Sequence, residues 1–194
     1  GVAIVWNITS GDVLHSLRAQ HPWWNADAPE LFPDGVRVVV YATSHSVDVW
    51  NASSGERLHK LDQCCADRAI KRVQVSPDGR AILVHSVNHT SHREFVGFWS
   101  ADTGLRLHPD WPLPCLSCHV AFLDTDTLVV CMRTRLPTAD PLSTRSWSVM
   151  SAGTGEVLGG PFRSKETAAA RGHEGGGDVE CIGLSSDGQR LAEY

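Results

Sequence analysis

The chain has 194 residues, of which 42% are apolar and 20% are charged, and its formal net charge is −5. This length and apolar content are enough to bury a sizeable core. The negative charge gives no reason to expect a general affinity for nucleic acid or for an anionic membrane. The sequence also contains no continuous apolar stretch long enough to predict a membrane-spanning helix.

One short turn recurs four times, each time at the end of an apolar strand. Its copies lie at residues 6–11, 50–55 and 99–104, with a weaker copy at 150–155, and their final glycines are 44, 49 and 51 residues apart. A period of this size predicts a repeat architecture, in which each unit buries its apolar face only against its neighbours.

A second recurring turn lies in phase with the first. Asp34, Asp78 and Asp187 each precede a glycine and then a short run of strand-forming residues, and residues 123–126 are a weaker copy. In such a turn the aspartate bonds back to the backbone and the glycine takes a positive φ, so the flanking runs are predicted to form a β-hairpin. Because Gly35 and Gly79 are again 44 residues apart, the two signals support the same repeat.

Each unit therefore contains four short strands, which is typical of a β-propeller blade. We predict an all-β fold, a partial β-propeller of about four blades, each a four-stranded antiparallel sheet. A half-blade covers residues 1–24, and another, with a leading loop, covers residues 164–194. Three complete blades are predicted between them, at residues 25–65, 66–112 and 113–163.

Several positions in the units match a known repeat. A tryptophan ends the third strand of three units, an Asp-Gly turn separates the first two strands, and a histidine precedes the turn glycine by 14 or 15 residues in two units. In these features the chain resembles the WD40-repeat family. The resemblance implies a propeller array, most often of seven blades, so we expect a segment of a longer array, with a closed four-bladed ring as the alternative. The residues that carry it are Trp6, Trp50, Trp99, Met150 in the weakest unit, His21, His173, Asp34, Asp78 and Asp187.

The chain departs from the family after the tryptophan. The family's aspartate is replaced by Asn7, Asn51, Ser100 and Ser151. The family's buried hydrogen-bond network cannot be completed within one blade, so we expect blades packed mainly by apolar contacts. In such blades Trp50 and Trp99 should be buried against the next blade.

The cysteines suggest a cofactor site only weakly. Residues 115–119 have the Cys-x-x-Cys-His spacing of c-type haem attachment, and Cys131 could join a zinc site there. However, Cys118 and His119 are in phase with the first strand of a blade, which favours a structural role. We expect no metal and no cofactor, and we expect the six cysteines to be reduced thiols, as in the cytoplasm.

The sequence contains no Gly-x-Ser-x-Gly, His-Glu-x-x-His, P-loop or Gly-x-Gly-x-x-Gly motif. We therefore expect a non-enzymatic scaffold that binds other proteins, or other domains of the same parent chain, and neither nucleic acid nor membrane. The alternative is a propeller enzyme of the quinoprotein or lactonase kind, in which histidines and carboxylates would converge on the channel.

Aromatic residues outside the repeat position are the candidates for partner binding. Trp23 and Trp24 are predicted in a loop between blades, and Trp111 in the corresponding loop two blades further on. If exposed together, these rigid side chains would form a binding rim. The competing interpretation is that they fill the wedge between neighbouring blades.

Overall fold

The computed structural model describes residues 2–18, 29–42, 46–61, 67–113, 118–134, 144–163, 182–184 and 191–193. All regular structure in these residues is β-strand, and they include no helix with the length and apolarity needed to cross a bilayer. The strands are β1 (Val2–Trp6), β2 (Val13–Arg18), β3 (Glu30–Leu31), β4 (Arg37–Ala42), β5 (Ser46–Asn51), β6 (Arg57–Leu61), β7 (Arg68–Val75), β8 (Ala81–Asn88), β9 (Glu94–Ser100), β10 (Arg106–Pro112), β11 (Cys118–Phe122), β12 (Thr127–Thr134), β13 (Thr144–Ser151), β14 (Val157–Arg163), β15 (Ile182–Leu184) and β16 (Leu191–Glu193).

Consecutive strands pair antiparallel. Among the described residues they form three four-stranded sheets, β3 to β6, β7 to β10 and β11 to β14, and two two-stranded sheets, β1–β2 and β15–β16. In each four-stranded sheet the strands follow one another in sequence order, as in a propeller blade. The predicted all-β class and the four-stranded antiparallel sheets are therefore confirmed.

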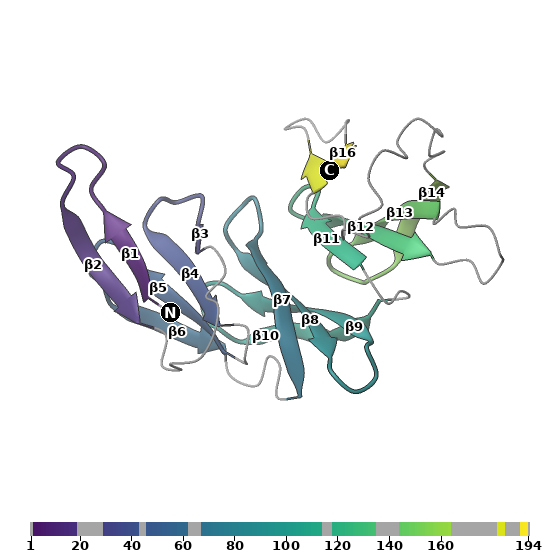
Figure 1. The fold of residues 1–194 in the computed structure, drawn as a ribbon, viewed down its shortest axis with the longest axis horizontal. Coiled ribbons are helices and arrows are strands. Elements are labelled where there is room, and N and C mark those ends of the chain that lie inside the picture. The colour runs from purple at the N-terminus through teal and green to yellow at the C-terminus, as the bar shows by residue number, and fades with distance from the viewer. Residues whose placement is uncertain are drawn as a thin grey trace, which may run out of the picture. The chain divides into compact units, whose positions relative to one another are not determined.

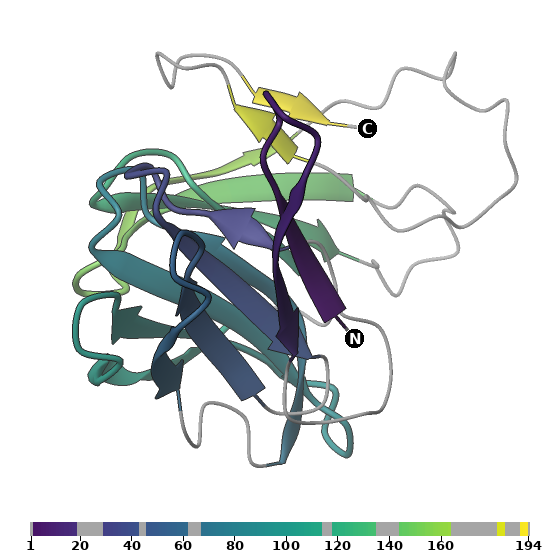
Figure 2. The same ribbon diagram turned by 90° about the vertical axis from the view of Figure 1, so that its left-hand side faces the viewer.

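The chain divides into two compact units, which are described separately (Figure 1). The first unit, Gly1–Leu113, holds β1 to β10, and the second unit, Pro114–Tyr194, holds β11 to β16. In the first unit the β3–β6 sheet lies between the β1–β2 sheet and the β7–β10 sheet. Figure 2 shows the purple β1–β2 ribbon lying over the β3–β6 sheet, with which it shares buried side chains.

Both faces of the β3–β6 sheet are buried, because side chains alternate between the faces along each strand. One face shares a core with the β7–β10 sheet, and the other shares a core with the β1–β2 sheet. The first core contains Val39, Val47 and Val49 with Val73, Ile82 and Trp99. The second contains Val38, Val40 and Ala52 with Ala3 and Leu17, and Trp50 packs against it.

The tryptophans face the opposite way from the prediction. We expected Trp50 and Trp99 to be buried against the next blade, but Trp99 shares its core with the preceding β3–β6 sheet, and Trp50 packs on the β1–β2 sheet. The reason is strand alternation. Val49 and Trp50 are neighbours in β5, so the valine faces forward to the next sheet and the tryptophan faces back.

The second unit repeats the same pairing. β11 to β14 pair antiparallel, and Leu128 lies opposite Met150 just as Val38 lies opposite Trp50 in the first unit. Met150 is half-buried, while Leu128 is 1% exposed. The weakest copy of the repeat therefore keeps the geometry of the stronger copies.

Candidate protein-interaction surface

Five turns in the structure share one backbone pattern. They cover residues 7–12, 51–56, 88–93, 100–105 and 151–156. The N–H of the first residue donates to the carbonyl of the sixth, and the N–H of the fifth donates to the carbonyl of the first. The fifth residue has a positive φ. It is glycine in four of the turns and His92 (φ 55°) in the fifth turn, which sequence analysis did not recognise as a copy.

The first residue of each of these turns is also its side-chain cap. The side-chain oxygen Oδ1 of Asn51 accepts hydrogen bonds from the N–H groups of Ser53 (2.8 Å) and Ser54 (2.9 Å). The hydroxyl of Ser100 accepts from the N–H of Thr103 at 3.3 Å. The residues that replace the family's aspartate thus satisfy the turn locally, as Asx and Ser/Thr turns do.

In the Asp-Gly hairpin turns, the aspartate side chain accepts hydrogen bonds from backbone N–H groups of the same turn. The Asp34 carboxylate accepts from the N–H groups of Val36 (2.8 Å) and Arg37 (2.9 Å). Burial raises the pKa of Asp34, but these N–H groups and the Arg37 side chain outweigh burial and hold the pKa below its ordinary value. The Ser76 hydroxyl, which donates to Asp78 at 2.6 Å, likewise lowers the pKa of Asp78.

One hydrogen bond joins the two turn types within each four-stranded sheet. An alanine after the third strand donates its N–H to the carbonyl that follows the hairpin turn of the same sheet. The two kinds of turn therefore lie at the same edge of the sheet. The pairs are Ala52 to Val36 (2.7 Å), Ala101 to Arg80 (2.8 Å) and Ala152 to Asp126 (2.6 Å).

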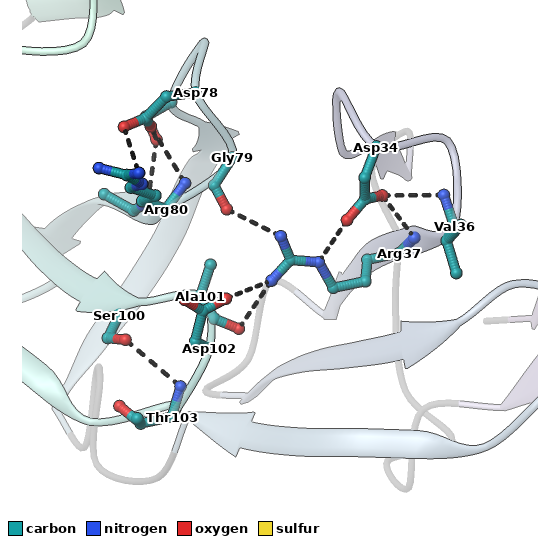
Figure 3. Close-up of polar contacts among 12 residues, drawn as sticks. Asp34, Val36, Arg37, Asp78, Gly79, Arg80, Ser100, Ala101, Asp102 and Thr103 are labelled. Carbon is teal, nitrogen blue, oxygen red and sulfur yellow. Dashed lines mark hydrogen bonds and ion pairs between the residues drawn. The ribbon is translucent and has the colours of Figure 1, made fainter.

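Arg37 joins this edge across two sheets (Figure 3). It pairs with Asp34 at 2.6 Å in its own turn and with Asp102 at 2.8 Å in the next sheet. It also donates to the carbonyls of Gly79 (3.1 Å) and Ala101 (3.3 Å). One guanidinium thus fixes three turns relative to one another, using the forked donor geometry that distinguishes arginine from lysine. We call the turns at residues 7–12, 32–37, 51–56, 76–81 and 100–105 the turn edge.

Large aliphatic side chains stand exposed on the turn edge and at its margin. Leu31 is 62% exposed just before the hairpin turn of the β3–β6 sheet, and Val36 is 40% exposed within that turn. Leu105 is 69% exposed directly after Gly104. Exposed apolar side chains that gather on one surface can mark a protein-binding site.

The outer strands carry a second link between sheets that sequence analysis missed. Nε2 of His15 donates to the carbonyl of Ser53 at 2.9 Å, and a Cβ on Gly55 would lie 2.6 Å from Nδ1 of the same ring. In the next sheet, a Cβ on Gly104 would lie 3.0 Å from the Cβ of His59. The sequence does carry a signal for these links, because a Leu-His pair lies three and four residues after Gly11, Gly55 and Gly104, at residues 14–15, 58–59 and 107–108.

The sequence analysis predicted that Trp111 lies in an inter-blade loop, and this is wrong. It lies in β10, the outer strand of its sheet, opposite Val96. It is half-buried, with its ring 5.0 Å from that of Phe98 and stacked 6.0 Å from that of His108. Trp23 and Trp24 lie outside the described residues. The described residues therefore do not test whether the three tryptophans form a rim, and this stays a prediction.

A buried charged cluster in the β7–β10 sheet was not predicted either. The Glu94 carboxylate, 1% exposed, accepts from Nζ of Lys71 (2.7 Å) and Nε2 of His85 (2.8 Å). Burial raises the pKa of Glu94, but the bonds from His85 and Lys71 outweigh burial and hold the pKa below its ordinary value. This sheet therefore adds a buried charged cluster to the apolar contacts that were expected to pack it.

The other predicted positions are distributed as follows. Trp6 ends β1 and is 55% exposed, whereas Trp99 is 3% exposed. Cys118 and His119 begin β11, as expected, and the described residues contain no group of three His, Cys, Asp or Glu side chains placed to hold a metal ion. His21, His173, Asp187 and Cys115 lie outside the described residues.

No model of a known protein family matches this chain, and no curated protein matches it. Among solved structures it is similar to the hydrazine synthase of Kuenenia stuttgartiensis, with a TM-score of 0.71 and 16% sequence identity over 98% of this chain. The chain spans 54% of the length of that chain. The matched protein contains a β-propeller, and at this identity the likeness shows the fold alone. The fold is therefore of the β-propeller type.

Proposed function

We propose that the chain is a WD40-like, non-enzymatic scaffold that binds protein partners through its turn edge. The observation that carries the proposal is the exposure of Leu31 and Leu105, at 62% and 69%, on turns held by Arg37. A rigid edge with exposed aliphatic side chains loses little conformational entropy when a partner covers it.

The WD40 assignment rests on the repeat itself. The strand-ending tryptophans, the Asp-Gly hairpins and the Trp-x-x-x-x-Gly turns recur in phase. The partners are other proteins or other domains of the parent chain, and neither nucleic acid nor a membrane is part of the proposal. The proposal includes a cytoplasmic location, which the expected reduced state of the six cysteines supports.

The test compares two double variants of the full chain by quantitative co-purification. Leu31→Ser with Leu105→Ser removes the two exposed leucines on the turn edge and at its margin. Leu58→Ser with Val157→Ser removes exposed aliphatic side chains of the outer strands and serves as the control. We expect the first variant to lose specific partners and to melt normally, and the control to keep them. Partners that survive in both variants would show that the turn edge is not the binding surface.

A further inference from the structure

The turn edge carries an excess of negative charge. Each of its five turns contains one carboxylate, and two of the turns also contain an arginine; none contains lysine or histidine. The acidic residues are Asp12, Asp34, Glu56, Asp78 and Asp102, and the arginines are Arg37 and Arg80. These 30 residues therefore have a net formal charge of −3, compared with −5 for the whole chain of 194 residues. Most of the negative charge of the chain is thus concentrated on this edge of the first unit.

The backbone of these turns does not require the acidic side chains. The turn of residues 88–93 has the same backbone hydrogen bonds, but it joins β8 and β9 at the opposite end of their sheet. It contains no carboxylate, and its sixth residue is the exposed Arg93. At the same position the turn of residues 51–56 has the exposed Glu56. The same local structure thus accepts either charge, so the acidity of the turn edge is a property of the surface and not of the turn.

The arginines that follow two of the turns do not cancel this charge. Arg57 lies 3.7 Å from the carboxylate of Asp48, which is buried, and Arg106 pairs with the largely buried Asp110. Each of these guanidinium groups therefore faces a carboxylate of its own sheet. The carboxylates of the turn edge are left to the two arginines within the turns.

The excess charge surrounds the exposed aliphatic side chains. Figure 3 shows the Arg37 guanidinium paired with two carboxylates, Asp34 of its own turn and Asp102 of the next sheet. Val36 is exposed in the first of these turns, and Leu105 is exposed in the second. The two turns joined by Arg37 thus present two apolar side chains together with one uncompensated negative charge. A partner that covers these side chains must also meet that charge.

We propose that the turn edge binds a segment of a partner protein in which basic side chains flank an apolar one. The inference rests on the proposed function, because it specifies the partner of the same surface. The apolar side chain of the segment covers Val36 and Leu105, and its lysines or arginines pair with Glu56 and Asp102. Complementary charge across an interface speeds association and selects among partners. Nucleic acid has the same sign of charge as this surface, which disfavours it as the partner.

Arg80 allows a test in the opposite direction. Its side chain is 84% exposed, and its guanidinium lies 3.9 Å from the carboxylate of Asp78, which is a weak contact. Arg80 therefore adds an exposed positive charge to an otherwise acidic edge and should repel a basic segment. Removal of Arg80 should strengthen the binding of such a segment, whereas removal of a carboxylate should weaken it.

The experiment measures the binding of fluorescently labelled synthetic peptides to the full-length chain by anisotropy. The probe is a short peptide in which lysines flank a pair of leucines. In one comparison peptide glutamates replace the lysines, and in the other serines replace the leucines. We expect the lysine–leucine peptide to bind at least about five times more tightly than either comparison peptide, because several charge pairs and the apolar contact act together.

Single variants then locate the binding on the turn edge. Glu56→Gln and Asp102→Asn should each weaken the binding of the lysine–leucine peptide by about two- to five-fold, as expected for the loss of one exposed charge pair. Arg80→Ser should strengthen the binding by a similar factor. Asp67→Asn makes the same change in net charge as Glu56→Gln, but at the opposite end of the β7–β10 sheet, and it should have no effect. Thermal melts of the variants check that each one folds.

Three results would overturn the inference. They are equal binding of the lysine and glutamate peptides, equal effects of Glu56→Gln and Asp67→Asn, and binding of a labelled oligothymidine to the turn edge. The proposed function would still hold in each case, provided that Leu31→Ser with Leu105→Ser loses its partners in co-purification. If that leucine variant instead binds the lysine–leucine peptide as tightly as the wild type, both proposals fail, because the apolar side chains then take no part in binding.

Discussion

The β3–β6 and β7–β10 sheets are built from the same repeat but are stabilised differently. In the β7–β10 sheet Trp99 is 3% exposed and lies under the guanidinium of Arg106. In the β3–β6 sheet Trp50 is half-buried, and its Nε1 has no hydrogen-bond partner among the described residues. The repeat position thus determines where the tryptophan lies, and the neighbouring residues determine how much it stabilises the sheet.

Buried charged residues are also paired more closely in the β7–β10 sheet than in the β3–β6 sheet. The β7–β10 sheet contains the Glu94 cluster and a second one in which Asp110 pairs with Arg68 (2.6 Å) and with Arg106. In the β3–β6 sheet the buried Asp48 lies 3.7 Å from Arg57, a longer and weaker contact. The β7–β10 sheet is therefore specified by directional polar contacts as well as by apolar packing, and it should be the more sensitive to substitution.

The largest difference should come from the tryptophans. Trp99→Ala removes a fully packed indole and should lower the free energy of unfolding by about 3–5 kcal/mol. Trp50→Ala should cost less, and Trp6→Ala should change the free energy of unfolding by no more than about 0.5 kcal/mol, because its side chain is exposed. Urea denaturation of the three full-length variants measures this order. Equal costs for Trp50 and Trp99 would contradict the comparison.

The next effect concerns Glu94. Glu94→Gln removes the charge that binds Lys71 and His85, and it should cost about 1–3 kcal/mol at neutral pH. The folded state holds the pKa of Glu94 below that of the unfolded chain. Its stabilisation is therefore complete above the unfolded pKa and is lost as the pH falls through the folded pKa. Urea melts between pH 3 and pH 7 should show a shallower acid decline in the variant than in the wild type.

Glu30 is a control for Glu94, because its pKa is shifted in the opposite direction. Burial raises its pKa, although the Val75 N–H that donates to it at 3.0 Å acts against this. Because the pKa of Glu30 is higher in the folded chain than in the unfolded chain, its contribution to stability is present below the unfolded pKa. That contribution is lost as the pH rises through the folded pKa. Glu30→Gln keeps an acceptor for Val75 and removes the desolvated charge, so it should not reduce stability at neutral pH. A loss as large as that of Glu94→Gln would show that the two carboxylates do not differ as described.

Substitution of Arg37, which holds three turns together, should have an intermediate effect on the free energy of unfolding. Arg37→Lys keeps the charge but loses the fork that reaches Gly79 and Ala101, so we expect a loss of about 1 kcal/mol in the free energy of unfolding. Asp102→Asn is the matched control. It changes only the 70%-exposed partner, so it should cost less than about 0.5 kcal/mol. Thermal melts of both variants show whether Arg37 stabilises the turns through the carbonyls of Gly79 and Ala101 or through its surface ion pair with Asp102.

The smallest effect should be a gain. His92 has the positive φ that the other four turns give to glycine, so His92→Gly should stabilise the chain by about 0.5–1 kcal/mol. Gly55→Ala in the equivalent turn should destabilise it, because its φ is +71° and the new Cβ would meet His15. Thermal melts of the pair test whether the two turns are copies. A destabilised His92→Gly would show that they are not.

Sequence analysis predicted the sheets well because turn chemistry and strand alternation are local. Gly35 and Gly79 have the positive φ that was expected of the Asp-Gly turns, and Gly11, Gly55 and Gly104 in the other turn also have a positive φ. The all-β fold and its four-stranded sheets follow from these turns and the strands between them.

What the sequence did not predict depends on contacts between distant residues. The direction of Trp99 depends on which sheet packs on which face, and the Glu94 cluster depends on β7, β8 and β9 lying side by side. Trp111 was assigned to a loop, but it lies in β10, an outer strand that contains Pro109 and Pro112, and an outer strand tolerates proline. The partner-binding role of the tryptophans stays a prediction.

The histidines beneath the turn glycines affect how the array can change in evolution. Each link consists of a histidine in one sheet and a glycine in the next, as in His15 with Gly55 and His59 with Gly104. A tandem duplication that copies whole units preserves every link, whereas an unequal crossover between a histidine and its glycine creates a mismatched neighbour. At residue 159 the corresponding position is glycine, so β14 carries no histidine there for such a link. Recombination at that point would separate blades without breaking a histidine link.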